Sequence, residues 1–157
     1  MSTTFVVPEQ AAAANMLGII LGDGLGVNIS DADGFEGQFV ATYIDDDGQL
    51  VAIGGGDPAF VAYAGAALSM IPAGAAQDMI DNNDISDAIR DNFYEVMNIC
   101  SRLLMTEIGD QHLRLDKTLS PGDAEEVISQ LSANGTPVGF ELNVPNYGAG
   151  RLNFLVT

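Results

Sequence analysis

Three polar side chains in the middle of the chain have types and spacing that could support chemistry on a bound partner. Asp91, Glu95 and Asn98 follow one another at steps of four and three residues. On an α-helix they project within roughly 60° of one another and about opposite Phe93. A carboxamide accepts one hydrogen bond and donates others, so Asn98 could orient a water molecule without becoming charged. Glu95, one turn earlier, could pair with a cation.

The segment around these residues has the periodicity of an amphipathic helix. Apolar residues recur at steps of three and four on its other face, namely Ile85, Ile89, Phe93, Val96, Cys100 and Leu103. This spacing predicts a central helix over about Asp84–Met105, with an extra turn possible before it. From the Glu-x2-Asn triplet alone, a solvated polar face is the simpler interpretation.

A longer pattern gives the triplet more meaning. The chain contains the series Asp-x3-Glu-x2-Asn-x22-Pro, formed by Asp91, Glu95, Asn98 and Pro121. It resembles the signature of the CheC/CheX/FliY family of chemotaxis phosphatases, which dephosphorylate the response regulator CheY. Only one copy of Glu-x2-Asn is present, so the single-site, CheX-like pattern is the closer one.

The resemblance implies a specific mechanism. Asn98 would orient the water that attacks the aspartyl phosphate of a CheY-type regulator, and Glu95 would pair with the lysine at its phosphorylation site. Asp91 would support this face, and Pro121 would shape the chain after the helix. The resemblance implies no cofactor of the protein's own, because Mg²⁺ would be held by the partner. It also implies a homodimer formed through sheet edges, for which the apolar strand at 150–157 is the candidate.

The chain departs from the family pattern beside the motif. Met97 stands where glycine is common, and Ser101 and Arg102 stand where relatives carry small residues. Arg102 lies one turn beyond Asn98 on the same face, where it could crowd the partner's approach or contact its acidic groups.

The remaining elements point to one α+β domain over residues 1–157. A helix is predicted over Pro8–Leu21, a β-hairpin from 37–45 and 49–53, and a buried helix after Asp57-Pro58. Further strands are predicted at 111–115, 136–144 and 150–156, and 122–135 is read as a short helix with a strand as the alternative. The expected architecture is an antiparallel sheet packed by two long helices plus a shorter helix, CheX/CheC-like.

Composition excludes several classes of function. Five basic against twenty-two acidic residues give a formal charge of −17, which disfavours binding to nucleic acid or anionic membrane. Neither a basic signal-peptide region nor a long apolar run is present, so no membrane insertion is expected. A single cysteine, Cys100, cannot form an internal disulfide, and a cytoplasmic location is the natural assignment.

Other chemistries fit the sequence less well. Gly22, Gly24 and Gly26 alternate, but Val27 stands at the third glycine position of a dinucleotide fingerprint and the predicted helix precedes them. The acidic segments 31–37 and 45–49 lack the spacing of an EF-hand loop. One histidine, His112, and one cysteine cannot form a zinc cluster, so structural roles are expected for both.

A second function class stays open beside the phosphatase. Flagellar rotor proteins share the general architecture expected here, so the chain could be a non-catalytic module that binds a response regulator or builds a rotor-like assembly.

Overall fold

The computed structural model of the chain describes residues 5, 7–22, 24–30, 38–105, 112–119 and 122–157. The helices are α1 (Gln10–Leu21), α2 (Pro58–Leu68), α3 (Ala73–Asp81), α4 (Asp87–Cys100), the short 3₁₀ helix η1 (Ser101–Leu104) and α5 (Glu125–Ser132). The strands are β1 (Gly26–Ser30), β2 (Phe39–Asp45), β3 (Leu50–Gly56), β4 (Leu113–Leu119), β5 (Thr136–Val144) and β6 (Gly148–Val156).

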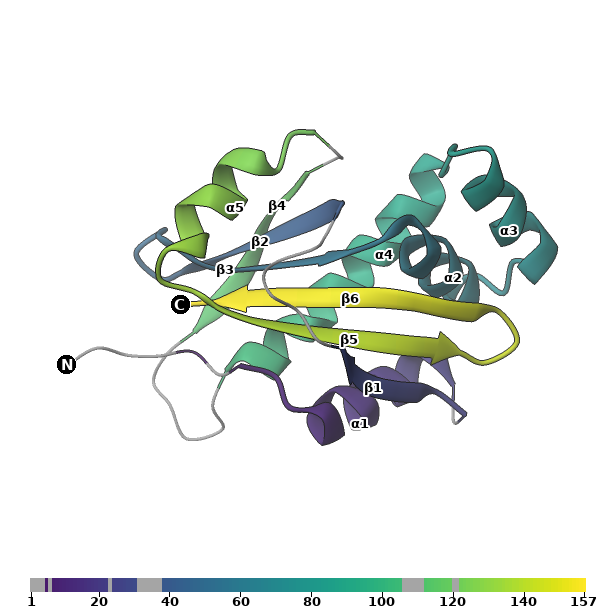
Figure 1. Cartoon of the computed structure of the whole chain (residues 1–157), viewed down its shortest axis with the longest axis horizontal. Helices are drawn as coiled ribbons and strands as arrows, with labels where there is room; N and C mark the ends of the chain where they lie inside the picture. Colours follow the sequence, from purple (N-terminus) through teal and green to yellow (C-terminus); the bar gives the residue numbers. More distant parts are fainter. Residues whose placement is uncertain (1–4, 6, 23, 31–37, 106–111, 120–121) are drawn as a thin grey trace.

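The strands form a single six-stranded sheet in the order β1-β5-β6-β3-β2-β4. Every neighbouring pair is antiparallel. β6 runs through the middle of the sheet, between β5 and β3 (Figure 1). The idea that this strand needs a partner molecule to cover it is therefore wrong, because both of its edges are already paired within the chain. The edges of the described sheet are β1 and β4.

The two faces of the sheet carry helices of different size. On one face of the sheet, α1, α2 and α4 pack to form the main hydrophobic core (Figure 1). On the other face, α5 covers a small hydrophobic cluster that includes Ile53, Leu131 and Leu155. Period-two alternation explains the division, since Ala52 and Phe154 belong to the main core while their neighbours Ile53 and Leu155 belong to the small one.

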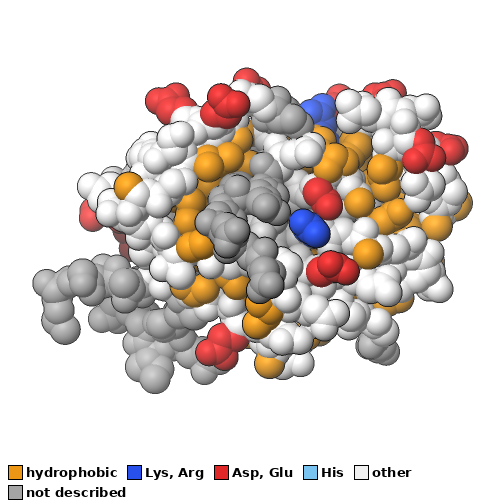
Figure 2. All heavy atoms as spheres, viewed as in Figure 1, with side chains coloured by type: hydrophobic (Ala, Val, Ile, Leu, Met, Phe, Trp, Pro, Cys, Tyr) orange, Lys and Arg blue, Asp and Glu red, His pale blue; other side chains and the backbone are white. Residues whose placement is uncertain are grey.

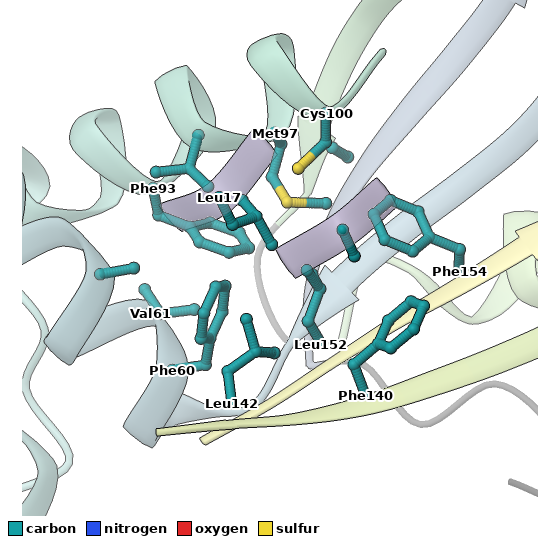
Figure 3. Packing of buried hydrophobic residues seen from close by; sticks show 14 of the residues in the cluster. Leu17, Phe60, Val61, Phe93, Met97, Cys100, Phe140, Leu142, Leu152 and Phe154 are labelled. Atoms are coloured by element: carbon teal, nitrogen blue, oxygen red, sulfur yellow. The ribbon is translucent and has the colours of Figure 1, made fainter. Parts of the chain in front are cut away.

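In the main core, aromatic and aliphatic side chains from helices and strands interdigitate (Figure 3). Met97 and Cys100 of α4 point toward the part of the sheet that carries Phe154, whereas Phe93 of α4 packs against Phe60 of α2, beside Leu17 of α1. All but Cys100 are among the largest fully buried side chains, and Cys100 is buried as well. This layer fixes α4 against the sheet and leaves its opposite face outside.

Local chemistry explains where the helices begin. The side chain of Asp57 accepts a hydrogen bond from the Phe60 N–H at 2.8 Å, and Pro58 occupies the first turn of α2. Ser86 caps α4 in the same way through the Ile89 N–H. In the hairpin between β2 and β3, Gly48 has φ +80, a left-handed conformation that suits glycine at this turn.

The α+β fold class and the antiparallel sheet are confirmed, with differences in detail. The helix predicted at 122–135 is present as α5, whereas α4 begins at Asp87 and the residues before it form a separate helix, α3. The described residues hold more helices than the two long and one short expected. β1 was not predicted, because Gly26 was read as part of a helix exit.

No helix in the described part of the chain has the length and apolar character needed to cross a membrane.

Candidate functional site

The site is built on α4, and a buried tyrosine ties the end of that helix to the sheet. The Tyr43 hydroxyl of β2 donates a hydrogen bond of 2.6 Å to the Met97 carbonyl. In a continuing α-helix that carbonyl would accept from Ser101, but the Ser101 N–H bonds back to Asn98 as the helix tightens into η1. Burial raises the pKa of Tyr43 well above its ordinary value, so this hydroxyl keeps its proton and stays a donor.

Two glycines allow α4 to lie close to its neighbours. A Cβ on Gly54 would lie 2.6 Å from the Met97 Cε, so the Met97 side chain fills the space that a larger residue in β3 would occupy. A Cβ on Gly65 would lie 2.6 Å from the Ile89 carbonyl oxygen, so α2 and α4 meet at backbone distance. Asn92 adds a hydrogen bond of 2.9 Å to the Gly65 carbonyl. α4 is thus held from two sides.

With its inner face fixed, α4 presents the motif side chains outward. Glu95 and Asn98 are both exposed, whereas Phe93, Val96 and Met97 are fully buried. A carboxylate and a carboxamide therefore stand one turn apart on the open side of a rigidly supported helix.

Glu95 and Asn98 border the same hollow, which lies between α4 and α1. Its volume is about 500 Å³. The described residues that line it are Met16, Ile19, Ile20, Glu95, Asn98, Ile99, Ser101 and Arg102. One wall is apolar and comes from α1, and the other is mainly polar and comes from the end of α4 and the start of η1.

Asp91 borders a different hollow. That space, of about 380 Å³, is lined by Asp87, Arg90, Asp91, Tyr94 and Thr118. Arg90 forms a salt bridge with Asp87 there. The side chain of Asp91 is exposed, but it is not brought to the same hollow as Glu95 and Asn98. Pro121, the last point of the motif, lies outside the described residues.

The three residues that depart from the family pattern have different positions. Met97 is completely buried and belongs to the core, so it does not border the hollow. Ser101 turns its hydroxyl back onto the Asn98 carbonyl at 2.7 Å and helps to end α4. Arg102 is exposed and lines the hollow beside Asn98. Ser101 also lines the hollow, so Arg102 is the charged one of the three that a bound partner would meet.

The other candidate groups lie away from this hollow. Burial raises the pKa of the Cys100 thiol to about 12, which keeps it protonated and unreactive. His112 is exposed, with its Nδ1 3.7 Å from an Asp46 carboxylate oxygen. Asp45 closes the hairpin turn by accepting from the Asp47 and Gln49 N–H groups, and segment 31–37 lies outside the described residues. No group of three or more potential metal ligands occurs within the described ranges.

Sequence reasoning missed the apolar wall of the hollow. Ile19 is 84% exposed, although it belongs to a helix whose Ala13, Leu17 and Leu21 are buried. The signal was present but weak, since α1 is apolar on nearly every side and periodicity alone does not show which residues face outward.

Acidic side chains outnumber basic ones over the face of the molecule that carries α5. Figure 2 shows red side chains spread over the visible face of the molecule with little blue between them. This distribution agrees with the formal charge of −17.

Comparisons with known proteins identify the fold. No family model matches the sequence, and no curated protein matches it significantly. A chain in the crystal structure of the FliM–SpeE complex from H. pylori is similar, with a TM-score of 0.62 and 11% identity over 94% of this chain and 80% of that one. The FliM middle domain from H. pylori is similar with a TM-score of 0.57 and 11% sequence identity, over 94% of this chain and 84% of that one. This chain has the FliM middle-domain fold.

A chemotaxis protein is also among the similar solved structures. The chemotaxis protein CheX from Desulfovibrio desulfuricans matches with a TM-score of 0.44 and 12% identity, over 94% of this chain and 95% of that chain. The likeness to FliM middle domains agrees with the predicted α+β fold class. Fold alone does not specify activity, which depends on the site residues.

Proposed function

We propose that this protein is a phosphatase that hydrolyses the aspartyl phosphate of a CheY-type response regulator. The observation that carries the proposal is the joint position of Glu95 and Asn98, exposed on one helix and bordering one hollow. The spacing of the sequence motif supports the same conclusion.

The proposed chemistry asks little of the protein beyond placement. An aspartyl phosphate already reacts with water, so a catalyst gains most by holding the water in line with the phosphorus. The Asn98 amide would accept one hydrogen bond from that water and donate another to an oxygen of the partner. Glu95 would pair with the lysine at the regulator's phosphorylation site. The Mg²⁺ would belong to the regulator, and Asp91 would support the helix face from the adjoining hollow.

The fixed backbone of α4 suits this role. Orientation lowers the barrier only if the orienting group is itself held, and a displacement of about 1 Å can cost a factor of about 10² in rate. The Tyr43 hydrogen bond to the Met97 carbonyl holds the helix within the motif, and the close contact between Gly65 and Ile89 holds it before the motif.

A phosphate-release assay tests the proposal directly. A CheY-type regulator from the same organism would be phosphorylated with a small phosphodonor, and the donor would then be removed. The loss of phosphate would be followed with and without substoichiometric protein. We expect multiple turnovers per molecule. A rate no faster than that of the regulator alone, although the two proteins form a complex, would exclude catalysis.

That negative result would support a second candidate, a non-catalytic module that binds a regulator or belongs to a flagellar rotor. The likeness to FliM middle domains favours it. A stoichiometric complex with the regulator and no acceleration would then be its signature.

A further inference from the structure

We propose that Arg102 is the docking residue through which this acidic protein holds the negatively charged phosphorylation site of its partner. The inference rests on the proposed function and assigns a role to a side chain outside the Glu-x2-Asn motif. Arg102 would contribute to the affinity for the regulator, whereas Asn98 would act in the chemical step.

The first argument is position. Arg102 follows Asn98 by four residues, in the 3₁₀ turn that ends α4, and both side chains line the same hollow. A partner close enough for Asn98 to place water on its phosphoryl group therefore comes within reach of the Arg102 guanidinium.

The second argument is availability. Arg102 has no salt bridge to a carboxylate within the described ranges, and Glu95 lies two turns away, about 10 Å along the helix axis. By contrast, Arg90 is paired with Asp87, and Arg151 lies opposite Glu141 in the sheet. Arg114 and Lys117 belong to β4, an edge strand of the sheet, and neither lines the hollow. Arg102 is thus the basic side chain that the hollow offers.

The third argument is charge. With a formal charge of −17, the protein repels an anionic partner at long range, and that repulsion slows association. A guanidinium at the contact point opposes the repulsion where it is greatest and supplies planar, paired N–H donors that match phosphoryl and carboxylate oxygens. Its position just after the C-terminus of α4 also favours a positive charge, so a structural role must be separated from docking.

The test compares Arg102→Gln, Arg102→Lys and the wild type in steady-state phosphate release. For Arg102→Gln we expect KM for the phosphorylated regulator to rise about tenfold while kcat changes less than about twofold, because the lost contact is made equally in the ground and transition states. Arg102→Lys should recover part of the loss. The difference between wild type and Arg102→Gln should shrink as salt rises toward about 0.5 M.

Arg114→Gln is the matched control, since it removes the same charge from an exposed position on β4 and should leave KM near the wild-type value. Equal KM values for Arg102→Gln and wild type would overturn the proposal, as would a fall in kcat at constant KM or a gain in activity from relieved crowding. A structural role alone would lower thermal stability without a salt-dependent change in KM.

A binding measurement separates this inference from the proposed function. The probe is the regulator loaded with beryllofluoride and Mg²⁺, a stable mimic of its phosphorylated form. If the wild type binds this probe about tenfold more tightly than Arg102→Gln yet accelerates no phosphate release, docking through Arg102 stands and the phosphatase proposal fails. If the wild type accelerates phosphate release and Arg102→Gln binds and turns over like the wild type, the phosphatase proposal stands and docking through Arg102 fails. No binding by the wild type overturns both.

Discussion

Asn98 and Glu95 are separable from the fold because their side chains are exposed while their neighbours Val96 and Met97 are fully buried. Substitutions of exposed residues usually change the free energy of unfolding by a few tenths of a kcal/mol. Activity and stability can therefore be measured independently at these two positions.

Asn98→Ala should remove most of the acceleration of phosphate release while leaving complex formation nearly intact. Loss of one orienting group typically costs a factor of about 10² to 10³ in kcat. Gln130→Ala, which removes a carboxamide from the exposed side of α5, is the control and should retain wild-type rates. Wild-type activity in Asn98→Ala would show that the proposed mechanism is wrong.

Glu95→Ala should weaken docking as well as turnover, because it removes the expected partner of the regulator's lysine. We expect KM to rise together with a fall in kcat, measured in the same assay. An increase in regulator affinity would contradict the assignment. Glu125→Ala, on α5, controls for the general effect of removing one negative charge from this acidic protein.

At the scale of elements, Gly65 fixes the distance between α2 and α4. Gly65→Ala would place its new Cβ against the Ile89 carbonyl, so α4 would have to shift, and overpacking of this kind costs about 1–3 kcal/mol. Gly18→Ala in α1 is the matched control, since no described atom lies within 4 Å of its Cβ position. It should stabilise the protein by up to about 1 kcal/mol through helix propensity. Urea unfolding checks both, and equal stabilities would refute the close contact.

The buried end of α4 predicts a loss of stability at high pH. Burial raises the pKa of Cys100 to about 12 from an ordinary value of 9.0. The folded state therefore holds this proton above pH 9 while the unfolded state loses it. The stabilisation is complete below pH 9 and declines as pH rises toward 12, at up to about 1.4 kcal/mol per pH unit. Tyr43, whose pKa is also raised, adds to the decline above about pH 10.

Urea unfolding between pH 8 and about 11 measures this decline. Cys100→Ala should show a shallower pH dependence than the wild type, although it is less stable at neutral pH because it leaves a small cavity. Identical slopes for the two proteins would contradict the assignment to the thiol.

The sequence predicted some elements well, for physical reasons visible in particular residues. α2 has an N-cap at Asp57 and a proline in its first turn. In α4, apolar residues such as Phe93 and polar residues such as Glu95 fall on opposite faces of the helix. Local sequence was therefore enough to predict both helices. The hollow could not be predicted in full, since its apolar wall depends on how α1 lies against α4. β1 was missed because glycines mask its short pattern, and its pairing with β5 is made by residues more than a hundred positions away.

For the molecule as a whole, self-association is still a proposal, but its expected surface has changed. β6 is enclosed by β3 and β5, so a dimer formed through sheet edges would use β1 or β4. β1 carries Ile29, which is 61% exposed. Light scattering at tens of micromolar should give about twice the 16.4 kDa chain mass. If β1 is the interface, Ile29→Lys should reduce the measured mass to that of the monomer. Thr118→Lys places the same charge on β4, the other edge strand, and should then leave the dimer mass unchanged.

The central position of β6 also has a consequence for synthesis. β6 leaves the ribosome after the other strands, yet it joins β5 to β3, and its partner residues in β3 lie about a hundred positions earlier. Until it emerges, the β2-β3-β4 part of the sheet and the β1-β5 pair have no strand between them, and the apolar side chains that meet Phe154 and Leu155 lack their cover. Non-local pairing of this kind is slow and leaves incomplete chains prone to aggregation. The nascent protein should therefore depend on chaperones until its last strand is added.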